Sequence, residues 1–476
     1  MGTEAVTPNP WMILPFGVLL AAIALAPLAF AGWWHRHYPK VALALGAVTL
    51  AYYLFGLHAH ERVWHTAHEY VSFIALIGSL FVVAGGIHIT VKGEATPAVN
   101  VLFLLVGAVI ANVLGTTGAA MLLIRPWLRM NKYRLTAHHV VFFIFIVANV
   151  GGCLTPIGDP PLFLGYLKGI PFWWVAAHCW PMWLTGVGLL LGLFYVLDTL
   201  NYRRAPTEVR ARETGGGEQW QFRGLRNLVF LAVILGAVFL EHPPFLREAI
   251  MLAAAAASYR FTPRPVHEAN DFNFEPIREV AILFLGIFAT MMPALDWLQT
   301  HARDFGQPTP GLFYWAAGTL SSVLDNAPTY LSFLSAEMGL FAPAELVRAV
   351  QAALAQGAAH AASGGGTHSP EVLAALQVLN GHFAAEVAAG NVPVEHIQIA
   401  ELLGMPKYNR FIVAVSIGAV FFGAATYIGN GPNFMVKSIA EHQKAHAPTF
   451  LDYVIRFTLP YLLPVLAVVW WVFFRG

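Results

Sequence analysis

The sequence predicts an all-α, polytopic membrane protein built from two repeats of inverted topology. This prediction rests on the composition, on the spacing of the apolar segments and on two matching Gly/Pro-rich interruptions. Of the 476 residues, 57% are hydrophobic and only 11% are charged, and the mean hydropathy is +0.61. An ordinary soluble protein is about 25% charged. The composition excludes an ordinary water-soluble enzyme and a disordered chain, and the net charge of +1 excludes a nucleic-acid binder.

Ten apolar segments are candidates for membrane spans, because a bilayer core of about 30 Å requires about 20 apolar helical residues. The first segment has no Lys or Arg before it and is longer than a usual signal-peptide core, so we interpret it as a retained span. The chain is therefore expected to be a multi-pass protein of an inner or plasma membrane, in contact with lipid. The ten segments are 11–31, 40–57, 70–89, 137–154, 172–198, 225–241, 246–259, 277–295, 409–427 and 451–474.

Two further apolar stretches, 97–124 and 310–339, are interrupted near the middle by polar, Gly and Pro residues. The interruption in the first stretch is 112–118, and in the second it is 321–329. The arm 97–111 would be about 22 Å long as a helix, which is too short to cross a bilayer. Irregular backbone at that depth is tolerated where protein or a water-filled cavity covers it. We therefore predict two re-entrant helical hairpins.

The distribution of Lys and Arg predicts the orientation. With ten spans and two hairpins, one side of the membrane carries 19 Lys and Arg residues and the other carries 8. The positive-inside rule then places the N-terminus outside. It also makes 201–224 a cytoplasmic linker and 341–407 a long outside loop, which we interpret as an insertion.

Two segments predicted to be broken helices, 137–170 and 409–440, share the pattern Thr-x-Ile-Gly-(Asp/Asn)-x-Pro. The pattern runs from Thr155 to Pro161 and from Thr426 to Pro432. Pro and clustered Gly cannot continue a helix without freeing backbone groups. Each half contains an odd number of crossings, so 1–200 and 225–476 are predicted to be inverted repeats. Paired interrupted segments of this kind indicate the binding site of a transporter.

Asp159 and Asp325 are the acids placed most clearly at membrane depth. A buried carboxylate is costly and usually functional, so each is a candidate for binding Na⁺ or a proton. The alternative for each is an N-cap of a half-helix.

Three motifs resemble the NhaD-type sodium/proton antiporters, and they equally resemble the related citrate-transporter group of the same ion-transporter (ArsB/NhaD) superfamily. They are Thr155-Pro-Ile-Gly-Asp-Pro-Pro161 with the residues up to Gly165, Ser322-Val-Leu-Asp-Asn-Ala-Pro-Thr329, and Glu275-Pro-Ile-Arg-Glu279 with the residues up to Phe284. The resemblance implies hairpins and broken helices that form the site and, as in many members of the superfamily, a homodimer with elevator-like movement. We expect no cofactor; Na⁺ and H⁺ would be transported. The chain lacks the Ser-Asn-Thr signature of the dicarboxylate symporters at its hairpin tips.

The resemblance also implies that each hairpin tip faces the broken helix of its own half, which predicts two polar clusters. The first cluster is Asp159 with Asn112, Thr116, Thr117 and Thr155. The second cluster is Asp325 with Asn326, Thr329, Thr426, Asn430 and Asn433. Carboxylate, hydroxyl and amide oxygens suit hard cations such as Na⁺.

These observations favour a secondary antiporter that exchanges Na⁺ or Li⁺ for H⁺, and the alternative is a cation-coupled carrier of citrate or a related carboxylate. No Lys or Arg lies beside either cluster except Lys168 and Lys437 further along, so an anion would meet two carboxylates and no guanidinium clamp. The segment from His58 to His68 contains four histidines, and only a real metal site there would support an enzyme. We expect a transporter.

Overall fold

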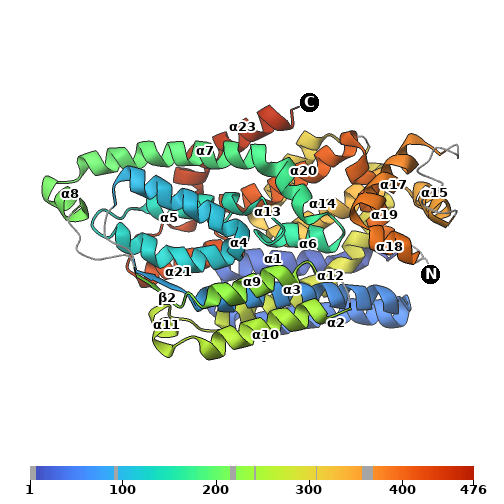
Figure 1. The fold of residues 1–476 in the computed structure, drawn as a ribbon, viewed down its shortest axis with the longest axis horizontal. Coiled ribbons are helices and arrows are strands. Elements are labelled where there is room, and N and C mark those ends of the chain that lie inside the picture. The colour runs from blue at the N-terminus through green and yellow to red at the C-terminus, as the bar shows by residue number, and fades with distance from the viewer. Residues whose placement is uncertain are drawn as a thin grey trace.

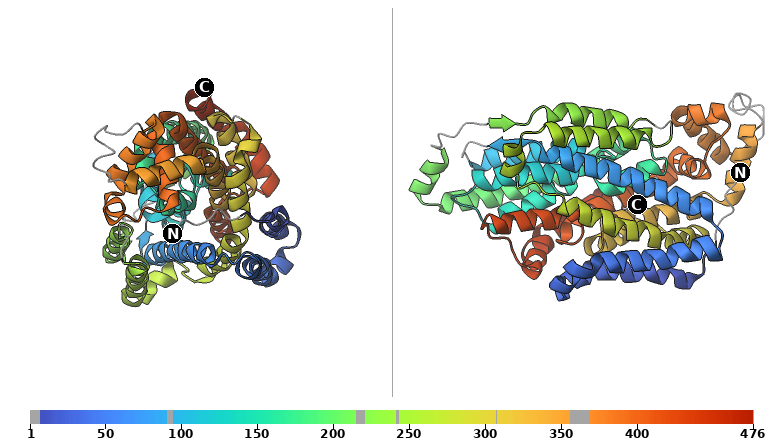
Figure 2. Two further views of the ribbon diagram at one scale, coloured as in Figure 1. Left: turned by 90° about the vertical axis from the view of Figure 1, so that its right-hand side faces the viewer. Right: turned by 90° about the horizontal axis from the view of Figure 1, so that it is seen from below.

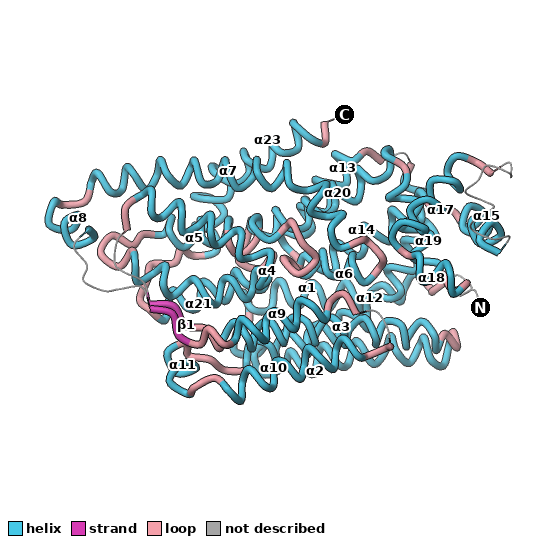
Figure 3. Tube along the Cα trace, viewed as in Figure 1, coloured by secondary structure: helices cyan, strands magenta, loops and turns pink. Residues whose placement is uncertain are grey.

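The computed structural model describes residues 7–90, 95–214, 221–240, 243–306, 308–355 and 368–475. The described residues form a bundle of helices that run roughly along the longest axis of the molecule (Figure 1). Helices α1 and α2 lie at one edge of the bundle (Figure 2). The only strands within the described ranges are β1 and β2, a short antiparallel pair in which Ile89 lies opposite Phe222 (Figure 3).

The first half of the chain contains η1 (Pro10–Ile13), α1 (Leu14–Ala29), α2 (Ala31–Ala51), η2 (Tyr52–Gly56), α3 (His60–Gly85), β1 (His88–Thr90), α4 (Pro97–Met130), α5 (Ala137–Ile146), η3 (Val150–Gly152), α6 (Pro160–Leu167), α7 (Phe172–Arg204) and α8 (Thr207–Thr214). The second half contains β2 (Gln221–Arg223), α9 (Asn227–Ala237), α10 (Leu246–Phe261), α11 (Arg264–Ala269), α12 (Glu275–His301), η4 (Ala302–Phe305), α13 (Pro310–Val323), α14 (Asn326–Phe341), α15 (Ala344–Ala355), α17 (Pro370–His382), α18 (Ala384–Ala389), α19 (Val394–Gly404), α20 (Pro406–Phe422), η5 (Gly423–Ala425), α21 (Gly431–His442), α22 (Phe450–Tyr453), η6 (Val454–Leu462) and α23 (Leu463–Phe473).

In the described residues, eight helices are long and apolar enough to cross a membrane. The predicted all-α, multi-pass membrane fold is thereby confirmed. Three of the ten predicted spans are shorter helices: 137–154 breaks after α5, 225–241 contains the 11 residues of α9, and 246–259 lies in the 16 residues of α10. The arrangement as ten crossings and two inverted repeats remains a prediction.

Helix α4 is long enough to be a span, but it folds back on itself. Its backbone reverses at Gly115, where φ is 73° and ψ is 157°, a region that only Gly adopts readily. The side-chain nitrogen of Asn100 lies 2.8 Å from the side-chain oxygen of Asn131. A straight helix would separate these residues by about 46 Å. The predicted hairpin 97–124 therefore exists, with its tip inside the predicted interruption.

The second predicted hairpin is formed by α13 and α14. The two helices are separated by Leu324 and Asp325, and the rings of Phe313 and Phe333 pack with centroids 5.5 Å apart. The chain therefore turns back between them. A bend of 75° then separates α14 from α15.

Both predicted broken helices are confirmed. The first stops at Ile146, continues through η3 and an irregular stretch, and resumes with Pro160 and Pro161 at the start of α6. The second stops at Phe422, continues through η5, and resumes at Gly431. Gly158 has to be Gly because a Cβ there would lie 2.0 Å from the carbonyl oxygen of Gly152.

The predicted outside loop 341–407 is largely helical. Helices α15, α17, α18 and α19 enclose a small apolar cluster of their own, centred on Val350, Ala375, Leu379 and Ala400. In Figure 1 they lie at the opposite end of the bundle from α8. A unit with its own core fits the interpretation as an insertion, and residues 356–367 lie outside the described ranges.

Candidate functional site

Each hairpin tip contacts the broken helix of its own half, as the resemblance implied. In the first half, the amide of Thr116 donates to the carbonyl of Gly158 at 2.8 Å, and the hydroxyl of Thr155 donates to the carbonyl of Asn112 at 2.6 Å. In the second half, the hydroxyl of Thr426 donates to the carbonyl of Ser322 at 2.6 Å. These contacts hold the irregular segment of each broken helix against the hairpin tip of the same half.

Asp159 lies where all four of these segments meet. Its carboxylate accepts hydrogen bonds from the Thr116 hydroxyl at 2.7 Å, the Asn326 amide at 2.5 Å and the Asn430 amide at 3.1 Å. Asp159 is 1% exposed. The three donors come from the first hairpin, the second hairpin and the second broken helix. All three donors are uncharged, so none of them compensates the negative charge of the ionised carboxylate.

The structure corrects the expectation of two separate clusters. Asn326 and Asn430 were predicted to surround Asp325, but both contact Asp159 instead. The carboxylate of Asp325 accepts from the amide of Ala327 at 3.0 Å, which makes it the N-cap of α14. Thr329 reaches only the backbone carbonyl of Asp325, at 3.0 Å. The capping alternative therefore describes Asp325, and the polar groups of both halves converge on Asp159.

Sequence reasoning missed Asn149, which is fully buried. Its amide donates to the side-chain oxygen of Asn433 at 2.6 Å, and its side-chain oxygen accepts from Asn430 at 3.1 Å. Asn433 in turn donates to the carbonyls of Gly423 and Thr426 at 2.7 and 2.8 Å. The signal was available, because Asn149 is a polar residue in an apolar run, two positions before Gly151.

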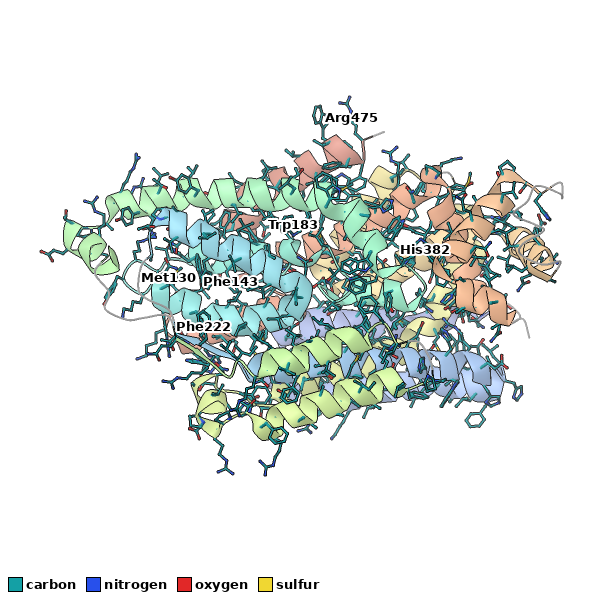
Figure 4. The ribbon with its side chains drawn as sticks, in the orientation of Figure 1. Met130, Phe143, Trp183, Phe222, His382 and Arg475 are labelled. Atoms are coloured by element: carbon teal, nitrogen blue, oxygen red, sulfur yellow. The ribbon has the colours of Figure 1, made fainter. Side chains whose placement is uncertain are left out.

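Three of the predicted site residues hold backbone rather than face the carboxylate. Asn112 donates to the carbonyl of Gly151 at 2.7 Å and accepts from the amide of Leu154 at 2.8 Å. Thr155 and Thr426 each bind a backbone carbonyl of their hairpin. Behind this region, Trp183 of α7 also donates to Gly151, at 2.8 Å (Figure 4). Asn112, Thr155 and Trp183 thus position the unwound segment that carries Asp159, and Thr426 holds the corresponding segment of the second half.

A small hollow lies beside Asp159, with about 20 Å³ of space for the centre of a water-sized molecule. Thr116 and Thr117 line it from the first hairpin, and Leu76, Leu80 and Phe81 of α3 form an apolar wall. Of the predicted site residues, Thr117 is thus placed at the hollow, where it is half-buried. In this conformation the hollow has room for about one water molecule next to the carboxylate.

The oxygen atoms around Asp159 suit a small cation or a proton. Within the described ranges, no Lys or Arg forms an ion pair with Asp159 or Asp325. The side-chain oxygen of Asn326 is buried and accepts no hydrogen bond from any described residue. A carboxylate, a hydroxyl and an open amide oxygen are ligands of the kind that hard cations prefer. The site is therefore a candidate cation site, and its carboxylate can also bind a proton.

The histidine-rich segment takes part in an ion-pair network through His65. Glu69 and Glu395 lie 2.7 and 2.8 Å from the ammonium of Lys168, and His65 lies 3.6 and 3.7 Å from the two carboxylates. The side chains of His65, Glu69 and Glu395 lie close enough to share a metal, and the single ammonium of Lys168 contacts both carboxylates. The second such group is Asp198 with two histidines, and Asp198 is bound to Arg134.

Lys168 and Glu395 perturb each other strongly. Burial alone raises the pKa of Glu395, but Lys168, with His65 and Arg62, outweighs burial and lowers this pKa to about 2. Burial lowers the pKa of Lys168, but Glu395 and Glu69 outweigh burial and raise it. The pair therefore stays charged at neutral pH. Lys168 connects the end of the first broken helix to α19 through Glu395 and to α3 through Glu69.

The membrane fold, the two hairpins and the two broken helices that meet at one buried carboxylate define a secondary transporter. A family described as "putative citrate transport" matches residues 5–474, and the chain belongs to this family within the ion-transporter superfamily. No curated protein matches the chain. The family match supports the citrate-transporter side of the resemblance and gives no support to the antiporter side.

Proposed function

We propose that the protein is a cation-coupled secondary transporter of citrate or a related carboxylate, in which Asp159 binds the coupling cation or proton. The observation that carries the proposal is the convergence of both hairpins and both broken helices on the Asp159 carboxylate. Any ion that binds Asp159 competes with these hydrogen bonds. Ion binding is thereby coupled to the packing of four segments, which is the requirement for alternating access.

The charge of the site explains why a carboxylate solute needs a cation. A citrate that reached Asp159 after the four segments had moved apart would meet two acids, since Asp325 is close enough to act electrostatically on Asp159, and no described Lys or Arg is ion-paired to either acid. Like charges in a low-dielectric interior repel strongly. A bound cation or proton removes this repulsion, so the ion binds first and the carboxylate second. The family description supports citrate as the solute.

A second candidate function is exchange of Na⁺ or Li⁺ for H⁺. The observation that favours it is the set of donors around Asp159, all of them uncharged, which leaves no counter-charge for an anion. In this case the same carboxylate takes either a cation or a proton, and no second solute binds.

One experiment separates the two functions. The purified protein is reconstituted into liposomes that contain a pH dye, and Na⁺, Li⁺, K⁺ and citrate are added separately and together. The carboxylate transporter accumulates radiolabelled citrate only when a cation or proton gradient is present. Proton movement driven by Na⁺ or Li⁺ alone, without citrate uptake, would instead support the exchanger. Asp159→Asn should abolish the activity in either case.

A further inference from the structure

Glu337 is a buried acid that the Asp159 site does not use. It lies in α14, is fully buried, and neither of its carboxylate oxygens has a hydrogen-bond partner among the described residues. An ionised carboxylate without a partner is costly in such an environment. In this conformation the stable form of Glu337 is therefore the neutral acid, with a proton on one oxygen.

Glu337 lies on the face of α14 that leads to Asp159. Asn326, Tyr330 and Glu337 are separated by four and seven positions, and at about 100° per residue they fall within about 40° of one another. Asn326 donates to Asp159 at 2.5 Å. Glu337 is 11 positions further along, a rise of about 16 Å. One helix face thus carries the contact to Asp159 at its tip end and a neutral acid at its other end.

Tyr330 lies between these two residues and faces the first broken helix. A Cβ at Gly165 would lie 2.4 Å from the Tyr330 hydroxyl oxygen, so this hydroxyl is pressed against α6. Helix α6 begins directly after Asp159. The phenol can donate and accept a hydrogen bond. The face therefore includes a group able to pass a proton between its two ends when water enters.

The charged and titratable neighbours leave Glu337 unpaired. Helix α14 packs against α6, α12, α13, α19, α20 and η4. No side chain of these elements forms a hydrogen bond or ion pair with Glu337 in the described part of the chain. The charged and titratable side chains of these elements are Tyr166 in α6, Glu275, Arg278, Glu279, Asp296 and His301 in α12, Tyr314 in α13, Glu395, His396 and Glu401 in α19, Lys407, Tyr408 and Arg410 in α20, and Arg303 and Asp304 in η4.

We propose that Glu337 is a second proton-binding site of the transporter, distinct from Asp159. Glu337 holds a proton while α14 is packed as in this structure. When movement of the second hairpin admits water, the carboxylic O–H bond breaks, the proton passes to water, and the carboxylate remains. Because α14 leads directly to α15, this exchange takes place toward the end of the molecule that carries α15 to α19. The inference rests on the proposed secondary transport, but not on the solute.

The test uses Glu337→Gln, which has nearly the shape of the neutral acid. Glu401→Gln is the matched control, since Glu401 is also buried with two unpartnered oxygens but lies in the insertion. Two rates are measured in proteoliposomes: exchange of the active solute across the membrane without net flux, and net proton movement with a pH dye. Glu337→Gln should retain exchange and lose proton movement by at least about tenfold. Glu401→Gln should retain both.

Wild-type proton movement in Glu337→Gln would overturn the inference, as would equal losses in Glu337→Gln and Glu401→Gln. If Glu337→Gln does not fold, Glu337→Asp is the second variant, and a pH profile of transport identical to wild type would overturn the inference. Failure of the proposed function would give a different result, because the unmodified protein itself would then transport no citrate. In that case the exchange and the proton movement of the Glu337 variants are measured with Na⁺ or Li⁺ as the solute.

Discussion

Asp159 and Asn430 occupy the same position of the two Thr-x-Ile-Gly motifs, and the Asn430 amide lies 3.1 Å from the Asp159 carboxylate. The two interrupted helices thus meet at corresponding residues, one charged and one neutral. The negative charge of the pair comes from the first motif, and in the proposed function it binds the ion. The second motif supplies a donor that holds this charge in place.

Asp159→Asn should abolish transport, whereas Asp325→Asn should retain most of it. The first change removes the carboxylate that four segments share, and an amide cannot carry a cation or proton. The second change retains a good N-cap for α14, since Asn caps helices as well as Asp. Transport is measured in proteoliposomes after the amount of folded protein is matched by gel filtration. Equal loss in both variants would show that Asp325 also binds the ion.

Asn149→Ala should weaken binding of the coupling ion without unfolding the protein. The change leaves the side chains of Asn430 and Asn433 without one partner each, and an unsatisfied buried polar group costs about 1–3 kcal/mol. The apparent affinity for the ion should fall about tenfold, as measured by the ion dependence of transport. The control is Asn391→Ala, which removes an exposed amide. An unchanged affinity would show that Asn149 is merely a packing residue.

Gly115→Ala should damage the tip of the first hairpin. An alanine would have to adopt a positive φ, and its Cβ would lie 3.1 Å from the carbonyl oxygen of Ile157. Strain of this type costs about 1–3 kcal/mol and moves Thr116 away from Asp159. The transport rate should fall by a larger fraction than the thermal unfolding temperature. Gly192→Ala in α7, where nothing lies within 4 Å of the new Cβ, should change neither quantity.

Lys168→Met should destabilise the protein by about 3–5 kcal/mol, because Glu69 and Glu395 would lose the positively charged partner that they share. The stability that Glu395 contributes is fully present above its unfolded pKa of about 4.3, and it is lost as the pH falls through about 2. The contribution of Lys168 is lost only as the pH rises through a pKa that is already raised. The difference in thermal unfolding temperature between wild type and variant should therefore stay constant from pH 6 to pH 9.

Lys437→Met is the matched control for Lys168→Met. Lys437 pairs with the exposed Glu441, and exposed pairs contribute less than about 1 kcal/mol. If the difference in thermal unfolding temperature between wild type and Lys168→Met changes clearly with pH near neutrality, the ion pairs of Lys168 with Glu69 and Glu395 are contradicted.

The predicted orientation can be tested with single cysteines in a protein whose Cys153 and Cys179 are replaced. Thr207 of α8 and Ala388 of α18 are exposed, and these two helices lie at opposite ends of the bundle (Figure 1). With the N-terminus outside, a membrane-impermeant reagent should label Ala388→Cys in intact cells and should label Thr207→Cys only after permeabilisation. The reversed pattern would invert the topology.

Much of the fold could be predicted from the sequence because its signals are local. Apolar length, Gly115 at a chain reversal and the prolines at positions 160 and 161 act within one or two helical turns. They identified the helices, both hairpins and both broken helices. The sequence and the resemblance also selected Thr116, Asp159, Asn326 and Asn430 as site residues. They paired Thr116 with Asp159 correctly but assigned Asn326 and Asn430 to Asp325.

The tertiary structure alone decided that these residues form one centre. Asp159 and Asn430 are 271 positions apart, and their contact depends on how four segments pack against one another. No local sequence pattern encodes a contact between residues so far apart in the chain. For the same reason the sequence could not separate the two acids: Asp159 and Asp325 have similar local surroundings, and only long-range packing gives Asp159 donors from three other segments while Asp325 caps its own helix.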